Sequence, residues 1–356
     1  MAKHGTGQVF HVTEDESGCT LAAYLRTKIK GTSWAVAERW IRNRRITIHG
    51  NICLDAARRL NKGEVVKFLD VPAPAPPGPQ DIKIVHLDDH VVVVDKPAGI
   101  TTTRHHEEAG WPARRRQLQP TLDELLPTVI GRFLKAAKQG KWKSGLKKER
   151  LHRSGQVRPV HRIDRETSGL LVFARTVPAG RILAEQFRQH TTDRKYLAIA
   201  VGHVGKGTII SSLVRDRGDG RRGSADNGKG KHAVTHVRPC EHFADAYTLV
   251  ECRLETGRTH QIRIHLAESG HPICGERVYS APVGCELKDQ SRTPRVALHA
   301  AELGFVHPVT GDKMFFYSRI PKDLQEVRKR LVKIYGKEIV EFPKDHQFAD
   351  FGPAGR

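Results

Sequence analysis

The sequence lacks the features that would place a protein in a membrane or on a secretory route. No apolar run approaches the roughly 20 residues that a membrane-spanning helix needs. The first residues, MAKHGTGQVFHV, contain no apolar leader, and the chain has no N-x-[ST] glycosylation site. We therefore expect a cytoplasmic protein that has no membrane partner.

Cysteine is scarce and scattered. None of the six cysteines forms a C-x-x-C pair, which argues against a zinc ribbon or a thioredoxin-like site. Their spacing in 356 residues does not resemble a disulfide framework, so we expect free thiols in a reducing compartment. There is also no H-E-x-x-H motif. We expect no metal. The six are Cys19, Cys53, Cys240, Cys252, Cys274 and Cys285.

Acidic residues are too few to balance the basic ones. Lys and Arg number 60 against 39 Asp and Glu, which gives a formal net charge of +21. Such an excess favours a polyanionic partner, most often a nucleic acid. The alternative is a generally basic, well-solvated surface. The hydrophobic fraction of 38% allows a packed core, so the chain is not expected to be disordered throughout.

A proline-rich segment, VPAPAPPGPQ, divides the chain. Five prolines in ten residues predict an extended, semi-rigid linker between two domains. We predict a flexible N-terminus (1–17), a small domain (18–70), this linker (71–80), a large domain (81–337) and a C-terminal tail (338–356).

The small domain combines helical and hairpin patterns. Leu21, Tyr24 and Leu25 recur at helical spacing, and Ser33 can cap a second helix. The stretch RITIHGNICL predicts a hairpin. Arginines lie outside the apolar stripe of the second helix, where they can face phosphates. The alternative is a structural domain whose charges are solvated. These arginines are Arg39, Arg42, Arg44 and Arg45.

The large domain is expected to be rich in strands. A helix is predicted over 122–138, another over 179–190, and an amphipathic helix near the C-terminus that includes Leu324 and Leu331. A stretch over 104–158 holds 14 basic residues, among them Arg114, Arg115 and Arg116, and 5 acidic ones. It is predicted to bind a polyanion, and the alternative is a solvated surface insertion. Strands are predicted at 82–86, 90–95, 169–175, 195–202, 233–239, 247–254 and 260–266.

The motif PVHRIDRETSGLLVFAR offers a carboxylate for chemistry. Asp164 stands between Arg162 and Arg165, just before a turn and an apolar strand. A carboxylate close to cations stays ionised and can serve as a nucleophile or a base. The alternative is an aspartate that only caps the turn or pairs with a neighbouring arginine.

Two further segments supply polar groups. If 260–266 is a strand, Gln261 and Arg263 share its polar face, where Arg263 would line a cleft. On the same strand His260 and His265 would point to opposite faces, which makes them poor zinc ligands. Arg258 could reach a phosphate or a base. In RKYLAIAVG, Tyr196 opens a strand and brings a phenol, although such a tyrosine is more often part of a core.

Together these segments resemble the RluA-type family of pseudouridine synthases. HRIDRETSGLLVFAR, RKYLAIAVG, TGRTHQIRIHLAESGHPICGERVY and LHAAELGFVHPVTGD occur in the order of the family's motifs, and VVVVDKPAGITTT resembles its opening strand and loop. The resemblance covers roughly residues 80–320. Residues 18–70 are similar to the small RNA-binding domain of the S-four type. The basic stretch 104–158 departs from the family because it is longer than the usual connection.

The resemblance implies an enzyme that isomerises uridine in RNA to pseudouridine without a cofactor. It implies an α+β fold: a catalytic domain on a bent, largely antiparallel central sheet, preceded by a small α/β RNA-binding domain of the αL type. Asp164 would be the catalytic aspartate, Arg263 its salt-bridge partner, and Tyr196 the active-site tyrosine. Arg162 and His161 match positions that approach the flipped nucleotide. Arg258, Gln261, Ile262 and Leu298 complete the predicted substrate-binding residues.

Three other functions can be compared with this one by the sequence features that each would need. A non-catalytic RNA-binding protein on the same scaffold would use the same basic patches but would not need Asp164, Tyr196 and Arg263. A methyltransferase would need a Gly-rich nucleotide loop after a strand, whereas the glycines at 218–230 lie in a basic loop with no helix predicted after it. A glycoside hydrolase would need a second positioned carboxylate, and we identify no convincing one near these motifs. We expect a monomer that acts on large-subunit ribosomal RNA, with transfer RNA as the alternative substrate.

Overall fold

The chain forms two compact units. One comprises residues 1–76 with 104–120, and the other residues 77–103 with 121–356. The predicted insertion 104–158 is therefore divided between them. Cys285, Arg114, Arg115 and the tail beyond residue 340 lie outside the described residues. The computed structural model describes residues 8–48, 51–73, 75–104, 110, 116, 119–138, 156–217, 221–225, 229–279 and 287–340.

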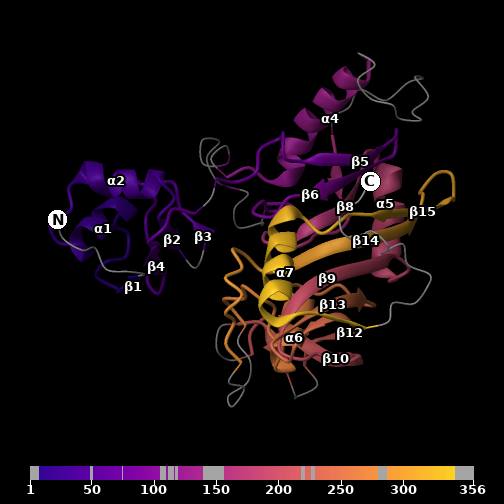
Figure 1. The fold of residues 1–356 in the computed structure, drawn as a ribbon. Coiled ribbons are helices and arrows are strands. Elements are labelled where there is room, and N and C mark those ends of the chain that lie inside the picture. Colours follow the sequence, from indigo (N-terminus) through magenta and orange to yellow (C-terminus); the bar gives the residue numbers. More distant parts are fainter. Residues whose placement is uncertain are drawn as a thin grey trace. The chain divides into compact units, whose positions relative to one another are not determined.

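The first unit packs two helices against a small antiparallel sheet (Figure 1). Its helices are α1 (Leu21–Lys28) and α2 (Trp34–Arg42), and its strands pair in the order β1-β4-β2-β3. The predicted hairpin over RITIHGNICL is confirmed as the antiparallel pair of β2 and β3. The strands are β1 (Val9–His11), β2 (Ile46–Ile48), β3 (Asn51–Ile52) and β4 (Val65–Phe68).

Side chains cap both helices of this unit, and the predicted cap of α2 at Ser33 is confirmed. The hydroxyls of Thr20 and Ser33 accept hydrogen bonds from Ala23 N and Val36 N, which satisfies free amides of the first turns. The apolar stripe of α2 buries Ala37 and Ile41 and leaves Trp34 48% exposed.

The predicted RNA-binding arginines of this unit differ in their surroundings. Arg39 and Arg42 are exposed on α2. Arg44 Nε donates to Ala73 O at 3.1 Å, and the Arg45 guanidinium lies 5.7 Å from the centre of the Phe68 ring. Of these four arginines, Arg39 and Arg42 therefore present their charge most openly to a partner, and Arg116, in the 104–120 part of the same unit, is exposed as well.

The second unit is built on a large, largely antiparallel sheet, as predicted. Its strands follow the order β11-β10-β12-β13-β9-β14-β8-β6-β5, with β15 beside β14, β16 beside β12 and β7 beside β8. Among the pairs between described strands, only β14 and β8 run parallel. The strands are β5 (Lys83–Leu87), β6 (Val91–Lys96), β7 (Arg158–Pro159), β8 (Ser168–Ala174), β9 (Asp193–Val201), β10 (Gly207–Val214), β11 (Gly223–Ser224), β12 (Lys231–Phe243), β13 (Tyr247–Leu254), β14 (Leu298–Val306), β15 (Lys313–Tyr317) and β16 (Glu338–Ile339).

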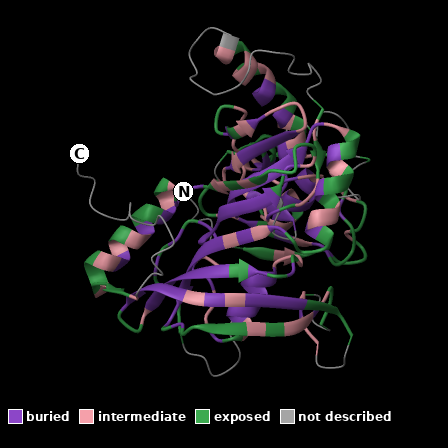
Figure 2. Ribbon diagram, turned by 90° about the vertical axis from the view of Figure 1, so that its right-hand side faces the viewer, coloured by how far each residue is buried: buried purple, intermediate pink, exposed green. Residues whose placement is uncertain are grey.

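Helices cover both faces of the sheet around β6 and β8, whose residues are buried almost throughout (Figure 2). Val91, Val93 and Leu170 belong to one core with α5 (Val177–Arg188). Val92, Val94 and Leu171 belong to the larger core, which also holds residues of α4 (Leu122–Lys138) and α7 (Lys322–Tyr335). Alternation along each strand sends successive side chains into different cores. These strands therefore read as continuous apolar runs in the sequence.

One predicted strand is wrong. Residues 260–266 belong not to a strand but to the start of a helix, α6 (Gln261–Glu268), entered through His260 at φ 61°. Seven of its eight residues are buried, the polar ones included, so no polar face marks the helical period in the sequence. Because these residues form a helix, the argument that Arg263 and Gln261 share the polar face of a strand is also wrong.

Among the described residues, none of the helices has the length and apolar character that crossing a bilayer requires.

Candidate active site

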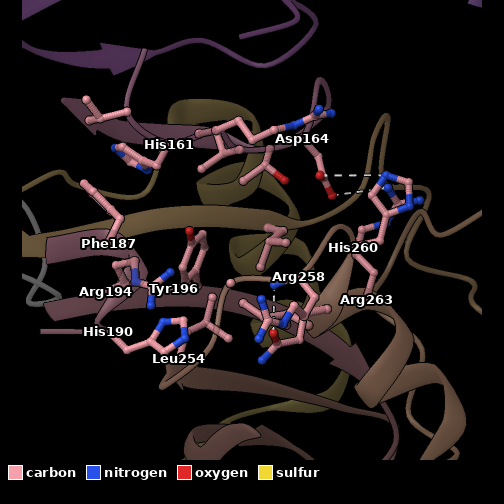
Figure 3. Close-up of a pocket in the computed structure, with 18 of the residues that line it drawn as sticks. His161, Asp164, Phe187, His190, Arg194, Tyr196, Leu254, Arg258, His260 and Arg263 are labelled. Atoms are coloured by element: carbon pink, nitrogen blue, oxygen red, sulfur yellow. Dashed lines mark hydrogen bonds and ion pairs between the residues drawn. The ribbon is translucent and has the colours of Figure 1, made fainter. Parts of the chain in front are cut away.

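A cavity of about 530 Å³ opens in the second unit beside the start of β8 (Figure 3). Several segments of the chain supply its walls: the loop before β8, the end of α5, strand β9, and the turn that leads into α6 together with the start of α6. The ends of β13 and β14 add Leu254 and Leu298. Every residue predicted to be catalytic or to bind substrate lines it: Asp164, Tyr196, Arg263, Arg162, His161, Arg258, Gln261, Ile262 and Leu298.

Asp164 lies in the loop that leads into β8, and its side chain is 17% exposed. Its carbonyl oxygen accepts from Thr167 N at 3.1 Å, which closes a tight turn. Just beyond, Gly169 takes φ +115°, and a Cβ there would lie 2.2 Å from Ala300 O of β14. Only glycine permits this close approach of two backbones. The carboxylate therefore stands on a loop whose far end is fixed to the sheet.

Arg263 is held mainly by a residue that the sequence reasoning missed. Its Nε and Nη2 donate to the two carboxylate oxygens of Glu276 at 2.7 and 2.8 Å, and its Nη1 lies 3.4 Å from Asp164 Oδ2. Burial alone would lower the pKa of Arg263, but the hydrogen bonds and the charge of Glu276, together with Asp164, raise it. The predicted Asp164–Arg263 pair is thus one arm of a triad with Glu276.

His260 approaches the other oxygen of Asp164. Its Nε2 lies 3.7 Å from Asp164 Oδ1, while its Nδ1 is 2.6 Å from the Tyr279 hydroxyl. Burial lowers the pKa of His260, and burial raises the pKa of Tyr279 to about 12. A neutral His260 that accepts from the phenol at Nδ1 carries its proton on Nε2, the nitrogen that faces Asp164.

Tyr196 extends from β9 into the cavity and is 8% exposed. Burial raises its pKa, and so does Asp164, whereas the charge of Arg194 lowers it. The phenol therefore keeps its proton near neutral pH. It offers the cavity both an aromatic face and a hydroxyl group.

The two residues before the Asp164 turn have different environments. The His161 ring stacks on Phe187 with centroids 4.1 Å apart, and its Nε2 accepts from Val172 N. Burial lowers the pKa of His161 to about 3, so it is neutral and part of the wall. Arg162 is exposed at the cavity and forms no ion pair with the residues that the structure describes. It is free to reach outward.

The side-chain amide of Gln261 is fully bonded within the fold. Its Oε1 accepts from Thr256 Oγ1 and Arg258 N, and its Nε2 donates to Val234 O and Thr235 Oγ1. These bonds use all of its donors and both acceptor positions. Gln261 therefore positions the start of α6. Because it also lines the cavity, its contact with substrate stays a prediction.

Ile262 and Leu298 form an apolar part of the wall. Each is 4% exposed, and both belong to the large core as well as to the lining of the cavity. Because the core fixes their side chains, they form a rigid apolar wall that a flat, neutral group can pack against.

The sequence reasoning also missed Arg194 and Tyr279. Arg194 lies two residues before Tyr196 and lines the same cavity. Tyr279 and Glu276 both stand in the segment CGERVY, which belongs to one of the motifs above. That position was the one sequence signal for a role in the site, because only the fold brings the segment next to α6.

Comparison with known proteins agrees with these observations. A sequence model described as "RNA pseudouridylate synthase" matches residues 90–268. "Ribosomal large subunit pseudouridine synthase D" of Zymomonas mobilis is 38% identical over 74% of this chain and 78% of its own length. The Escherichia coli K12 protein of the same name is 31% identical over 89% of this chain and 91% of its own.

Two further relatives extend the comparison. "Uncharacterized RNA pseudouridine synthase YlyB" of Bacillus subtilis is 31% identical over 90% of this chain and 97% of its own. The solved structure "Human RNA Pseudouridylate Synthase Domain Containing 4" matches with a TM-score of 0.51 and 23% identity, over 70% of this chain and 92% of that one, which supports the fold. The chain belongs to the RNA pseudouridylate synthase family.

Proposed function

We propose that this protein isomerises uridine to pseudouridine in large-subunit ribosomal RNA, with Asp164 as the catalytic carboxylate. The observation that carries the proposal is the triad in the cavity: Asp164 beside Arg263, which Glu276 grips with two hydrogen bonds. The relatives named as synthases of the ribosomal large subunit support the choice of RNA.

The reaction needs what this cavity supplies. The bond between N1 of uracil and C1′ of ribose breaks, and a bond between C5 and C1′ forms; C5 loses a proton and N1 gains one. Electrons balance without an oxidant or a reductant. Asp164 acts at the sugar carbon as the glycosidic bond breaks. Arg263 pairs with that carboxylate and holds it in place.

The substrate must leave its base stack to reach Asp164. A cavity of about 530 Å³ is within the size range of small-molecule sites. We infer that Tyr196 stacks on the flipped uracil, with Ile262 and Leu298 as the apolar wall. The exposed Arg162 is suited to fill the gap that the uridine leaves.

The first unit supplies general RNA affinity in this proposal. Arg39 and Arg42 are exposed on α2 and can grip phosphates without reading sequence. The net charge of +21 supports such contacts along the chain.

The test is a map of pseudouridines in total RNA from cells with and without this protein. We expect at least one site in large-subunit ribosomal RNA to disappear when the protein is absent and to return with the wild-type gene. A lost site in transfer RNA alone would replace ribosomal RNA as the substrate. An unchanged map would favour a non-catalytic RNA-binding protein.

A further inference from the structure

Arg194 is a buried cation without a counter-charge. It is 7% exposed, and it forms no ion pair with the described part of the chain. Its Nη2 donates to the carbonyl oxygen of Glu255 at 3.1 Å, while its Nε is buried and has no hydrogen-bond partner. A buried guanidinium in this state is costly, unlike Arg263, which Glu276 neutralises. Such a group is suited to an anion that arrives with the substrate.

The surrounding wall of the cavity is also positive. Arg258 and His190 line it together with Arg194. Burial lowers the pKa of Arg194, and the charge of Arg258 lowers it further. Burial and the charges of both arginines lower the pKa of His190, so the positive charge of this wall comes from Arg194 and Arg258. Among the described lining residues the one carboxylate is Asp164, which pairs with Arg263. Figure 3 shows Arg194 and His190 on the side of the cavity away from Asp164 and Arg263. The positive charge on that side is not needed to hold the catalytic carboxylate.

Gly257 leaves room for this guanidinium. A Cβ on Gly257 would lie 2.5 Å from Arg194 Nη1, far inside van der Waals contact. Gly257 is exposed and its φ lies outside the left-handed region, so neither core packing nor backbone strain requires a glycine. A methyl group at this position would therefore displace the end of the Arg194 side chain.

We propose that Arg194, with Arg258 beside it, binds a phosphodiester group that flanks the target uridine. This inference rests on the proposed function, because the anion is part of the RNA substrate. The contact reads no base. It anchors the backbone on one side of Tyr196 so that the flipped nucleotide presents its C1′ to Asp164 on the other.

The first test measures RNA affinity against salt concentration, without turnover. The probe is a fragment of large-subunit ribosomal RNA that contains the mapped uridine, and all proteins carry Asp164→Asn so that the RNA is not consumed. Arg194→Met should weaken binding about tenfold at low salt, as expected for a lost charge-assisted hydrogen bond. It should also reduce the slope of log K against log salt by about 0.7–0.9, the value for one phosphate contact.

Two matched variants separate this site from overall charge. Arg253→Met removes an exposed arginine that pairs with Asp193 and does not line the cavity, and it should leave the slope near the starting value. Gly257→Ala keeps every charge but displaces the guanidinium, and it should reproduce much of the Arg194→Met loss. Equal slopes for Arg194→Met and Arg253→Met would overturn the proposal.

The second test identifies the phosphate. A neutral methylphosphonate replaces the phosphate on the 5′ or the 3′ side of the target uridine. One of these substitutions should weaken binding of the starting protein and have no further effect in Arg194→Met. Additive losses at both positions would reject a direct contact. A wild-type protein that forms no pseudouridine would reject the proposed function instead, because these affinities are measured without catalysis.

Discussion

Replacement of Glu276 by glutamine tests how the proposed catalytic carboxylate, Asp164, is held. The side chains of Glu276 and Arg263 are 2% and 8% exposed and share two hydrogen bonds of 2.7 and 2.8 Å. Glutamine keeps the shape but removes the charge and one acceptor. Removing one partner of a buried ion pair costs about 3–5 kcal/mol. At the lower figure the melting temperature should fall by about 6–12 °C in a domain of this size.

Activity should fall further than stability explains. Glu276 holds Arg263 through two charged hydrogen bonds. When that carboxylate is lost, the guanidinium can shift relative to Asp164, whose Oδ2 lies 3.4 Å from Arg263 Nη1. A displacement of about 1 Å at a reacting group can cost on the order of 10²-fold in rate. Glu276→Gln should therefore lower kcat by that order at a temperature where circular dichroism shows the protein folded.

The matched control is Glu241→Gln. Glu241 also binds an arginine, Arg328, through two hydrogen bonds, and their side chains are 3% and 14% exposed, but neither residue lines the cavity. Its melting temperature should fall by a similar amount while kcat stays near wild type. Equal kcat values for the two variants, both folded, would refute the argument that Glu276 positions Arg263 for catalysis.

Three further changes have defined outcomes. Burial lowers the pKa of His161 to about 3, and it lowers the pKa values of His265 and His299 to about 4 each. Below pH 6.5 the unfolded chain binds protons there that the native state does not, so each histidine should remove up to about 1.4 kcal/mol of stability per pH unit. The urea midpoint should therefore fall from pH 7 to pH 5, and equal midpoints would contradict this. Arg263→Lys should lose most activity while its dichroism spectrum stays native, because an ammonium cannot bridge Glu276 and Asp164 as a guanidinium does; wild-type turnover would reject the role. Gly169→Ala, whose Cβ would meet Ala300 O at 2.2 Å, should melt well below Gly205→Ala, whose Cβ meets nothing within 4 Å.

Much of the fold could be predicted because local patterns and packing agree. The helix over 122–138 and the strand over 247–254 match the structure at both ends, since their periodicity is continuous and turn residues bound them. Ser33 could be identified as a helix cap for the same local reason.

Helix α6 could not be predicted from its pattern. In H-Q-I-R-I-H-L polar and apolar residues alternate, which is the period of a strand. The polar side chains are buried instead, and each finds a distant partner: Arg263 bonds to Glu276, and His265 to Thr235 and Ser211. Tertiary hydrogen bonds thus replace the solvated face that would have revealed the helix.

The residues of the site likewise fall into those that could be predicted from the sequence and those that could not. Asp164, Tyr196 and Arg263 stand in motifs that could be recognised along the chain. Glu276 and Arg194 act through contacts between segments that the sequence does not connect. That Glu276 neutralises Arg263, and that Arg194 has no ion-pair partner among the described residues, can be seen only in the folded structure.

The central claim is that Asp164 carries out the isomerisation. The most direct measurement uses ribosomal RNA labelled with tritium at C5 of uridine, because pseudouridine formation releases that hydrogen to water. Wild-type protein should release tritium, and Asp164→Asn, which removes the charge and keeps the shape, should bind the RNA and release none. Tritium release by the folded Asp164→Asn protein at the wild-type rate would contradict the account.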